Sequence, residues 1–159
     1  MVIAYIREFF VPQGILGETL ETAVPWSKVN QVKDEANKLL TELHKKYDLP
    51  GKPFFCSRIS KVYHTGICMY NTMGINVRGI KNPEKVFSDI EHKIRECFIK
   101  NGGSISHHHG VGKLRKDFMP ETISPGSIDV IQGIKKSQDP NNIFGILSLI
   151  HISEPTRRY

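Results

Sequence analysis

The segment ICMYNTMGINV, residues 67–77, alternates between apolar and polar side chains. Its odd positions are mostly apolar, whereas its even positions include Cys68, Tyr70, Thr72 and Asn76. Alternation with a period of two is typical of a strand that packs one face on a core and turns the other away. We therefore expect a strand here, with Tyr70 on its polar face.

Helical periodicity lies on both sides of this strand. Apolar residues recur every three or four positions over residues 26–47, which predicts an amphipathic helix that Pro50-Gly51-Lys52-Pro53 ends. A further strand is expected over residues 54–62. A second helix is expected over residues 83–100, with Asn82 as its N-cap.

These patterns together predict an α+β fold, an antiparallel sheet covered by helices. Two amphipathic helices bury their apolar stripes most simply on one face of the sheet. The spacing of Ile128, Ile131 and Ile134 indicates a third, shorter helix within residues 120–138. A chain of 159 residues is long enough to bury one core.

Composition narrows the class of protein. Hydrophobic residues make up 39% of the chain, and no apolar run reaches the length of a membrane span. Cys56, Cys68 and Cys97 have no paired spacing and indicate reduced thiols. The net charge is +6, but the basic stripe with interleaved aromatics that nucleic-acid binders carry is missing. We therefore expect a small anionic substrate and no nucleic acid.

Three adjacent histidines stand in the segment SISHHHGVGKLRK, residues 104–116. Neighbouring side chains do not share a face on a strand or a helix, which argues against all three rings binding one metal ion. The Gly112-Lys113 pair lacks the spacing of a phosphate-binding P-loop. A solvated basic loop is the remaining interpretation from residue types alone.

The longer segment 101–116 resembles the signature of the alkyldihydroxyacetonephosphate synthase family. Ala4-Tyr5-Ile6-Arg7 and Leu16-Gly17-Glu18-Thr19 resemble further segments of that family in the same order. Asp139-Pro140-Asn141-Asn142-Ile143-Phe144-Gly145 is similar to the wider superfamily of FAD-linked, vanillyl-alcohol-oxidase-like enzymes. The resemblance implies the cap or substrate domain of such an enzyme.

The resemblance also implies an activity. Enzymes of this family use FAD, without net redox change, to exchange the acyl group of acyl-dihydroxyacetone phosphate for a long-chain fatty alcohol. The product carries the ether bond of ether lipids. A peroxisomal location, a homodimer and a peripheral association of the parent protein with membranes are implied in the same way.

Site residues follow from the matching positions. Tyr70 matches the acid–base tyrosine of the family, and Arg7 and Thr19 match substrate-binding positions. His107, His108 and His109 are implied in catalysis and in binding the cofactor, and no metal is expected. A free tyrosine has a pKa of about 10, so a basic role requires nearby cations.

The resemblance divides the chain in two. Residues 1–146 are expected to be the C-terminal cap or substrate region, with the FAD-binding domain upstream. Residues 147–159 resemble a translated sequencing adapter, and we expect them to be a non-native tail.

Two alternatives remain. One is an FAD-dependent 2-hydroxy-acid dehydrogenase, although those enzymes usually carry an acidic residue where this chain has His108. The other is a non-enzymatic basic binding module. The chain also departs from the synthase family at residues 71–74, where the family is richer in aromatics, so the pocket for the alkyl chain is expected to differ in shape.

Overall fold

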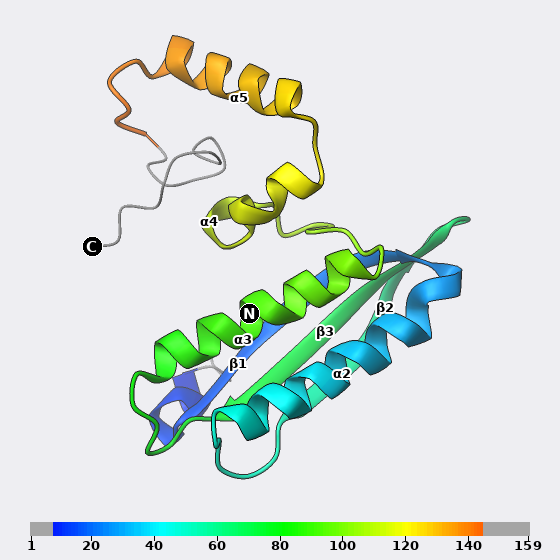
Figure 1. Ribbon diagram of the computed structural model, residues 1–159, viewed down its shortest axis with the longest axis vertical. Coiled ribbons are helices and arrows are strands. Elements are labelled where there is room, and N and C mark those ends of the chain that lie inside the picture. Colours follow the sequence, from blue (N-terminus) through cyan, green and yellow to red (C-terminus); the bar gives the residue numbers. More distant parts are fainter. Residues whose placement is uncertain (1–7, 145–159) are drawn as a thin grey trace. The chain divides into compact units, whose positions relative to one another are not determined.

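The computed structural model describes residues 8–144, which fall into two compact units. The first unit ends at His107 and the second begins at His108. Figure 1 shows the labelled elements of both units. None of the helices in the described part of the chain is long and apolar enough to cross a membrane.

The first unit contains a three-stranded antiparallel sheet. Strands β1 (Ile15–Pro25), β2 (Phe54–Val62) and β3 (Gly66–Asn76) lie in the order β1-β3-β2. The alternation over residues 67–77 therefore marks the central strand, and the α+β prediction is confirmed. Sequence analysis did not predict β1, which follows the short 3-10 helix η1 (Val11–Gln13).

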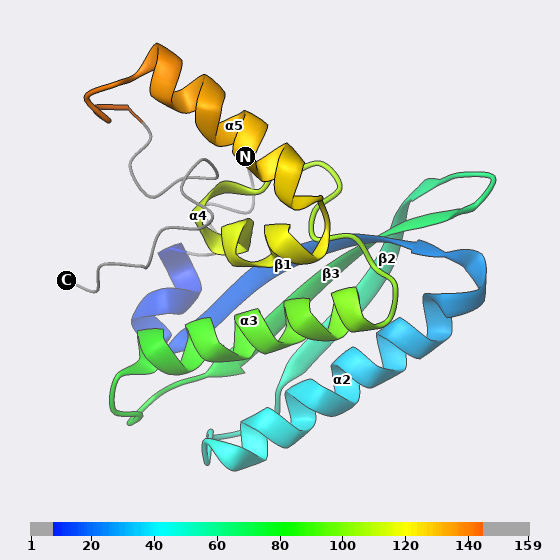
Figure 2. The ribbon, with the colours of Figure 1, turned by 45° about the horizontal axis from the view of Figure 1, so that its top comes forward.

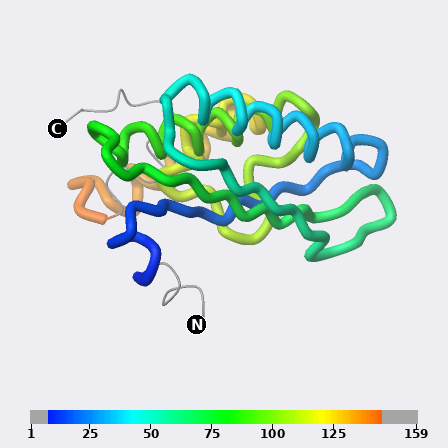
Figure 3. The backbone as a smooth tube through the Cα atoms, turned by 90° about the horizontal axis from the view of Figure 1, so that it is seen from below, coloured from blue at the N-terminus to red at the C-terminus, as the bar shows by residue number. Residues whose placement is uncertain are grey.

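Two helices cover one face of this sheet. Helix α2 (Val29–Lys46) follows the 3-10 turn η2 (Trp26–Lys28), and helix α3 (Pro83–Lys100) follows β3. Figures 2 and 3 show both helices on the same side of the sheet. The prediction for Asn82 is wrong in one respect: Asn82 precedes α3 in a left-handed conformation, but its side chain makes no capping hydrogen bond.

The core lies between the sheet and these helices. Each fully buried side chain of the size of leucine contributes about 1.5–3 kcal/mol, so this layer supplies most of the stability of the first unit. The members of this core cluster that are at most 1% exposed are Leu20, Val32, Ala36, Leu40, Ile67, Met73, Ile75, Ile90 and Ile94.

A buried polar residue interrupts the apolar face of β3. Asn71 is fully buried, and its Nδ2 donates to the carbonyl of Leu20 at 3.2 Å. Its Oδ1 accepts a hydrogen bond from the hydroxyl of Ser57 at 2.6 Å. Asn71 thus links the central strand to both neighbours, which offsets the cost of burying an amide.

The polar positions of β3 lie on the other face of the sheet, which we call the far face because it is turned away from α2 and α3. Tyr70 is half-buried and Thr72 is exposed there, while Met69, Met73 and Ile75 belong to the core on the helix side. The prediction that Tyr70 lies on the polar face is confirmed.

The segment after α3 runs along the outer edge of β1. Ser104 donates its backbone N–H to the carbonyl of Ala23 at 3.0 Å, and its Oγ accepts the N–H of Ala23 at 2.9 Å. Gly103 permits this approach, because a Cβ there would lie 2.5 Å from Oγ1 of Thr22. The start of the triple-histidine segment is therefore fixed to an edge strand.

The second unit is helical. It contains α4 (Gly112–Arg115), η3 (Lys116–Glu121) and α5 (Pro125–Gln138), and α5 confirms the predicted third helix. Ser124 caps α5 by accepting the backbone N–H of Ser127 at 3.2 Å. No residue of α5 is buried.

Candidate active site

Three polar side chains form a row across the far face of the sheet. The strand register places Glu21 of β1 opposite Tyr70 of β3, and Tyr70 opposite Arg58 of β2. The guanidinium carbon of Arg58 lies 4.6 Å from the centroid of the Tyr70 ring, a cation–π contact. The row thus places an acid, a phenol and a cation side by side.

Glu21 connects this row to the triple-histidine segment. Its carboxylate is 1% exposed, and Oε1 accepts the hydroxyl of Ser106 at 2.8 Å. Oε2 accepts the backbone N–H of His107. A buried carboxylate needs such donors, so Glu21 and the 106–107 peptide stabilise each other.

The ring of His107 contacts the hairpin between β2 and β3. Its Nε2 lies 2.6 Å from the phenolic oxygen of Tyr63, and the two ring centroids are 5.7 Å apart. Glu21 holds the backbone of His107 while Tyr63 holds its ring. His107 is therefore brought into the candidate site of the first unit.

His108 and His109 belong to the second unit. Both side chains are exposed, and their rings meet edge to face with centroids 4.4 Å apart. Residues 105–110 form neither a helix nor a strand. The expectation that adjacent histidines point to different faces, which holds for helices and strands, therefore does not apply to them. Arg115 donates to the carbonyl of Gly110 at 3.1 Å and closes the turn after the histidines.

A set of potential metal ligands lies in the first unit. One ligand atom each from Glu21, Cys68 and His107 lie within 4.8 Å of one another. Both oxygens of Glu21 already accept hydrogen bonds from Ser106 and His107, which competes with coordination. The expected absence of a metal stays a prediction.

An apolar cavity begins beside Tyr70 on the sheet. Thr19 of β1 and Thr72 of β3 form the next cross-strand pair on the far face, beside the pair of Glu21 and Tyr70. Both threonines line a cavity of about 690 Å³. Gly17 and Gly74 form the following cross-strand pair on the same face, and they contribute no side chains to the cavity. Phe10 and Phe54 are among the remaining lining residues. Thr19 therefore lies at the wall of a cavity that suits an apolar chain.

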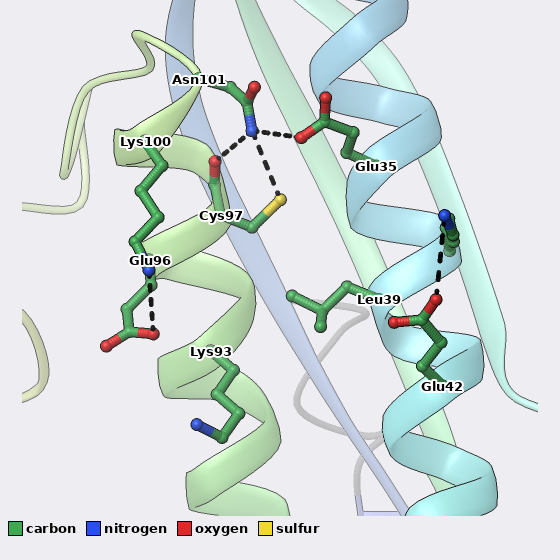
Figure 4. A pocket seen from close by; sticks show the side chains of 9 residues that line it. Glu35, Leu39, Glu42, Lys93, Glu96, Cys97, Lys100 and Asn101 are labelled. Atoms are coloured by element: carbon green, nitrogen blue, oxygen red, sulfur yellow. Dashed lines mark hydrogen bonds and ion pairs between the residues drawn. The ribbon is translucent and has the colours of Figure 1, made fainter.

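A second hollow lies between α2 and α3, where polar side chains join the two helices. Figure 4 shows Glu35 and Asn101 facing each other across it, and Asn101 Nδ2 donates to Glu35 Oε2 at 2.7 Å. Hydrogen bonds from Gln31 and Asn101 lower the pKa of Glu35. Burial raises the pKa of the Cys97 thiol, which disfavours the nucleophilic thiolate.

Two predictions lie outside the described residues, namely the substrate-binding role of Arg7 and the tail at residues 147–159. Conversely, sequence analysis assigned no role to Glu21, Tyr63 or Arg58. Glu21 carried a signal, because it stands two residues after Leu16-Gly17-Glu18-Thr19, the segment that resembles the synthase family. Tyr63 and Arg58 carried none. The contact of Arg58 with Tyr70 depends on the register of β2 with β3, and the contact of Tyr63 with His107 depends on how two distant segments meet in space.

Comparisons with known proteins identify the family of the chain. Residues 1–145 match the family "FAD linked oxidases, C-terminal domain". The chain is 41% identical over 150 residues to an alkyldihydroxyacetonephosphate synthase of Caenorhabditis elegans, which covers 94% of the chain and 25% of the relative. It is 26% identical over 148 residues to the enzyme of the same name from Dictyostelium discoideum, covering 93% of the chain and 24% of the relative.

A solved structure supports the fold. The structure of an alkyldihydroxyacetonephosphate synthase matches with a TM-score of 0.62 at 21% identity, over 87% of this chain and 21% of that chain. The chain thus spans about a quarter of the length of the curated relatives it matches. Because residues 1–145 match this family, the chain belongs to the FAD-linked oxidases and corresponds to their C-terminal domain.

Proposed function

We propose that the chain supplies one wall of the active site of an alkyldihydroxyacetonephosphate synthase. The reaction exchanges the acyl group of acyl-dihydroxyacetone phosphate for a long-chain fatty alcohol. The observation that carries this proposal is the cross-strand pair of Glu21 and Tyr70, with Glu21 bound to the first histidine of the His107–His109 segment. The names of the relatives support the same activity.

Tyr70 is the proposed base. As the phenolate it removes a proton from the carbon that carries the ester, and as the resulting phenol it later returns a proton, while Arg58 supplies a positive charge beside the ring. The histidines donate hydrogen bonds to the negative charge that develops on the neighbouring oxygen. The acyl group leaves as a carboxylate before the alcohol attacks the same carbon.

FAD is the proposed cofactor, and when bound it supplies the ring system at which the exchange takes place. The far face of the sheet fits such a ring, since imidazole and guanidinium groups there suit its polar edge. We place the FAD-binding segment elsewhere in the full-length protein. His107, His108 and His109 are the proposed cofactor-binding residues of this chain.

Two further features support this assignment of the substrate. The apolar cavity of about 690 Å³ suits a long alkyl chain, and its wall includes Thr19. The anionic end of the substrate requires a fixed cation, which Arg7 is proposed to supply through its planar guanidinium. Homodimer formation, contact with a membrane surface and a peroxisomal location accompany this proposal as properties of the full-length protein.

The dehydrogenase alternative has less support. Probable D-2-hydroxyglutarate dehydrogenase from Oryza sativa subsp. indica matches 43% of the chain, at 33% identity over 69 residues. The synthases from C. elegans and D. discoideum match more than nine-tenths of the chain.

The test is to supply the full-length protein with acyl-dihydroxyacetone phosphate and a labelled fatty alcohol. We expect alkyl-dihydroxyacetone phosphate and one free carboxylate per turnover, measured by mass spectrometry. Tyr47→Phe is a matched control, because Tyr47 bonds Asp89 between the helices and lies away from the site. Oxidation of 2-hydroxyglutarate without ether formation would replace the proposal with the dehydrogenase.

A further inference from the structure

His107 is held at two points that fix its ring. Its backbone N–H binds a carboxylate that is 1% exposed, and its Nε2 lies 2.6 Å from the hydroxyl of Tyr63. The preceding residues are also fixed, because Ser104 pairs with Ala23 on the edge of β1. Contacts within the chain therefore define the position of the His107 backbone and the orientation of its ring.

Tyr63 is itself held firmly, although it lies near the tip of a hairpin. Its backbone N–H donates to the carbonyl of Gly66 at 2.8 Å. Its carbonyl accepts a hydrogen bond from Nε1 of Trp26 at 3.1 Å. Gly66 can approach β1 only because it lacks a Cβ, which would lie 2.1 Å from the carbonyl oxygen of Val24. The backbone of Tyr63 is thus fixed, and its phenol, on a residue that is 43% exposed, reaches the His107 ring.

The direction of this hydrogen bond follows from the chemistry of the two groups. A phenol O–H is a stronger donor than a neutral imidazole N–H. The bare nitrogen of an imidazole is a stronger acceptor than a phenol oxygen. In a neutral histidine one ring nitrogen donates and the other accepts, and the partner of one nitrogen selects the tautomer. Donation from Tyr63 to Nε2 leaves the ring proton on Nδ1.

We propose that Tyr63 is a positioning residue that sets His107 as the Nδ1-protonated tautomer, with Glu21 fixing the backbone from the other side. His107 then acts as a hydrogen-bond donor through Nδ1 and not as the base. The catalytic role of His107 in this inference rests on the proposed function. In that function Tyr70 transfers the proton, and His107 stabilises the negative charge that develops. The tautomer itself can be measured whether or not the function is correct.

The test is nitrogen NMR on the full-length protein labelled with ¹⁵N-histidine, at pH 8.5, where imidazoles are ordinarily neutral. The His107 signals are assigned by their loss in His107→Gln. We expect the wild-type ring to carry its proton on Nδ1 and Tyr63→Phe to increase the fraction of the Nε2-protonated tautomer. Tyr47→Phe also removes one phenolic hydrogen bond, but away from the site, and should leave the His107 signals unchanged.

Two results would overturn the inference: a wild-type ring protonated on Nε2, or an unchanged Nδ1 tautomer in Tyr63→Phe. In the ether-forming assay, Tyr63→Phe should lower kcat about fivefold, the effect of one net hydrogen bond, and leave KM unchanged. If the wild-type protein forms no ether product, the proposed function fails while the NMR result still decides the tautomer.

Discussion

Glu21 is the residue that relates the histidine segment to Tyr70. It lies directly across from Tyr70 in the sheet and accepts donors from both Ser106 and His107. A shift of β1 by one residue would turn its carboxylate to the helix side and break both bonds, because side chains alternate between faces. The register of β1 is therefore part of the chemistry of the site.

Gly74 determines the depth of the apolar cavity. A Cβ at Gly74 would meet Phe54 Cβ at 3.7 Å and the Leu16 carbonyl at 3.8 Å, which are ordinary contacts. Gly74→Val should therefore fold and narrow the cavity. We expect kcat/KM for hexadecanol to fall by about tenfold while that for decanol changes little.

The control for this variant is Gly133→Val in α5, where a Cβ meets no atom within 4 Å. Activity on both alcohols should be unchanged in that protein. An unaltered chain-length profile in Gly74→Val would show that the cavity does not hold the alkyl chain.

His108 is proposed to act without a metal. His108→Ala should lower ether formation but leave the metal content of the full-length protein unchanged, as measured by elemental analysis of both proteins. One zinc ion per chain in the wild type, lost in the variant, would contradict the expected absence of a metal and would make His108 a zinc ligand.

At the scale of elements, the turn after α5 explains why the Asp139–Gly145 segment begins with an aspartate. Asp139 Oδ1 accepts the backbone N–H of Ile143 at 2.9 Å, and Oδ2 accepts that of Phe144 at 2.9 Å. The ammonium of Lys135 binds the same carboxylate from the last turn of the helix. These contacts indicate a structural role for this aspartate.

The Lys135 hydrogen bond, with help from the two backbone donors, lowers the pKa of Asp139 to about 2. An aspartate in the unfolded chain has a pKa of about 4. The ionised Asp139 carboxylate therefore contributes its full stabilisation of the folded state above pH 4, and this contribution is lost as the pH falls from about 4 to about 2. We expect Asp139→Asn to lower the melting temperature at pH 7. The difference from wild type should shrink as the pH falls below 4.

Thermal unfolding followed by circular dichroism measures both effects. Asp129→Asn is the matched control, since Asp129 is an exposed residue of α5, the helix that Asp139 follows. An Asp139→Asn protein that melts like Asp129→Asn at pH 7 would rule out the stabilising role.

The elements differ in how far they could be predicted. Strand β3 and helices α2 and α3 were predictable, because each buries one regular face and so shows a clear period. Strand β1 was missed because both of its faces become buried near Leu20, Glu21 and Thr22, which removes the alternation. The site was predictable at Tyr70, whereas the bond between His107 and Tyr63 depends on how residues 44 positions apart meet in space.

For the molecule as a whole, the proposed function gives this chain one wall of the active site. We therefore predict that the 159-residue chain, purified alone, retains no FAD and forms no ether product, because the cofactor carries the chemistry. An absorption spectrum without the flavin bands is the expected result. Stoichiometric yellow protein would show that the chain binds FAD by itself.

In the proposed function, Tyr70 removes the proton from the ester-bearing carbon of the substrate. The direct measurement is the exchange of that hydrogen with solvent deuterium in the full-length protein, for wild type and Tyr70→Phe. We predict that Tyr70→Phe keeps its FAD but exchanges about a hundredfold to ten-thousandfold more slowly, as for the loss of a general base. Exchange at the wild-type rate in Tyr70→Phe would contradict the account and would move the role of base to one of the three histidines.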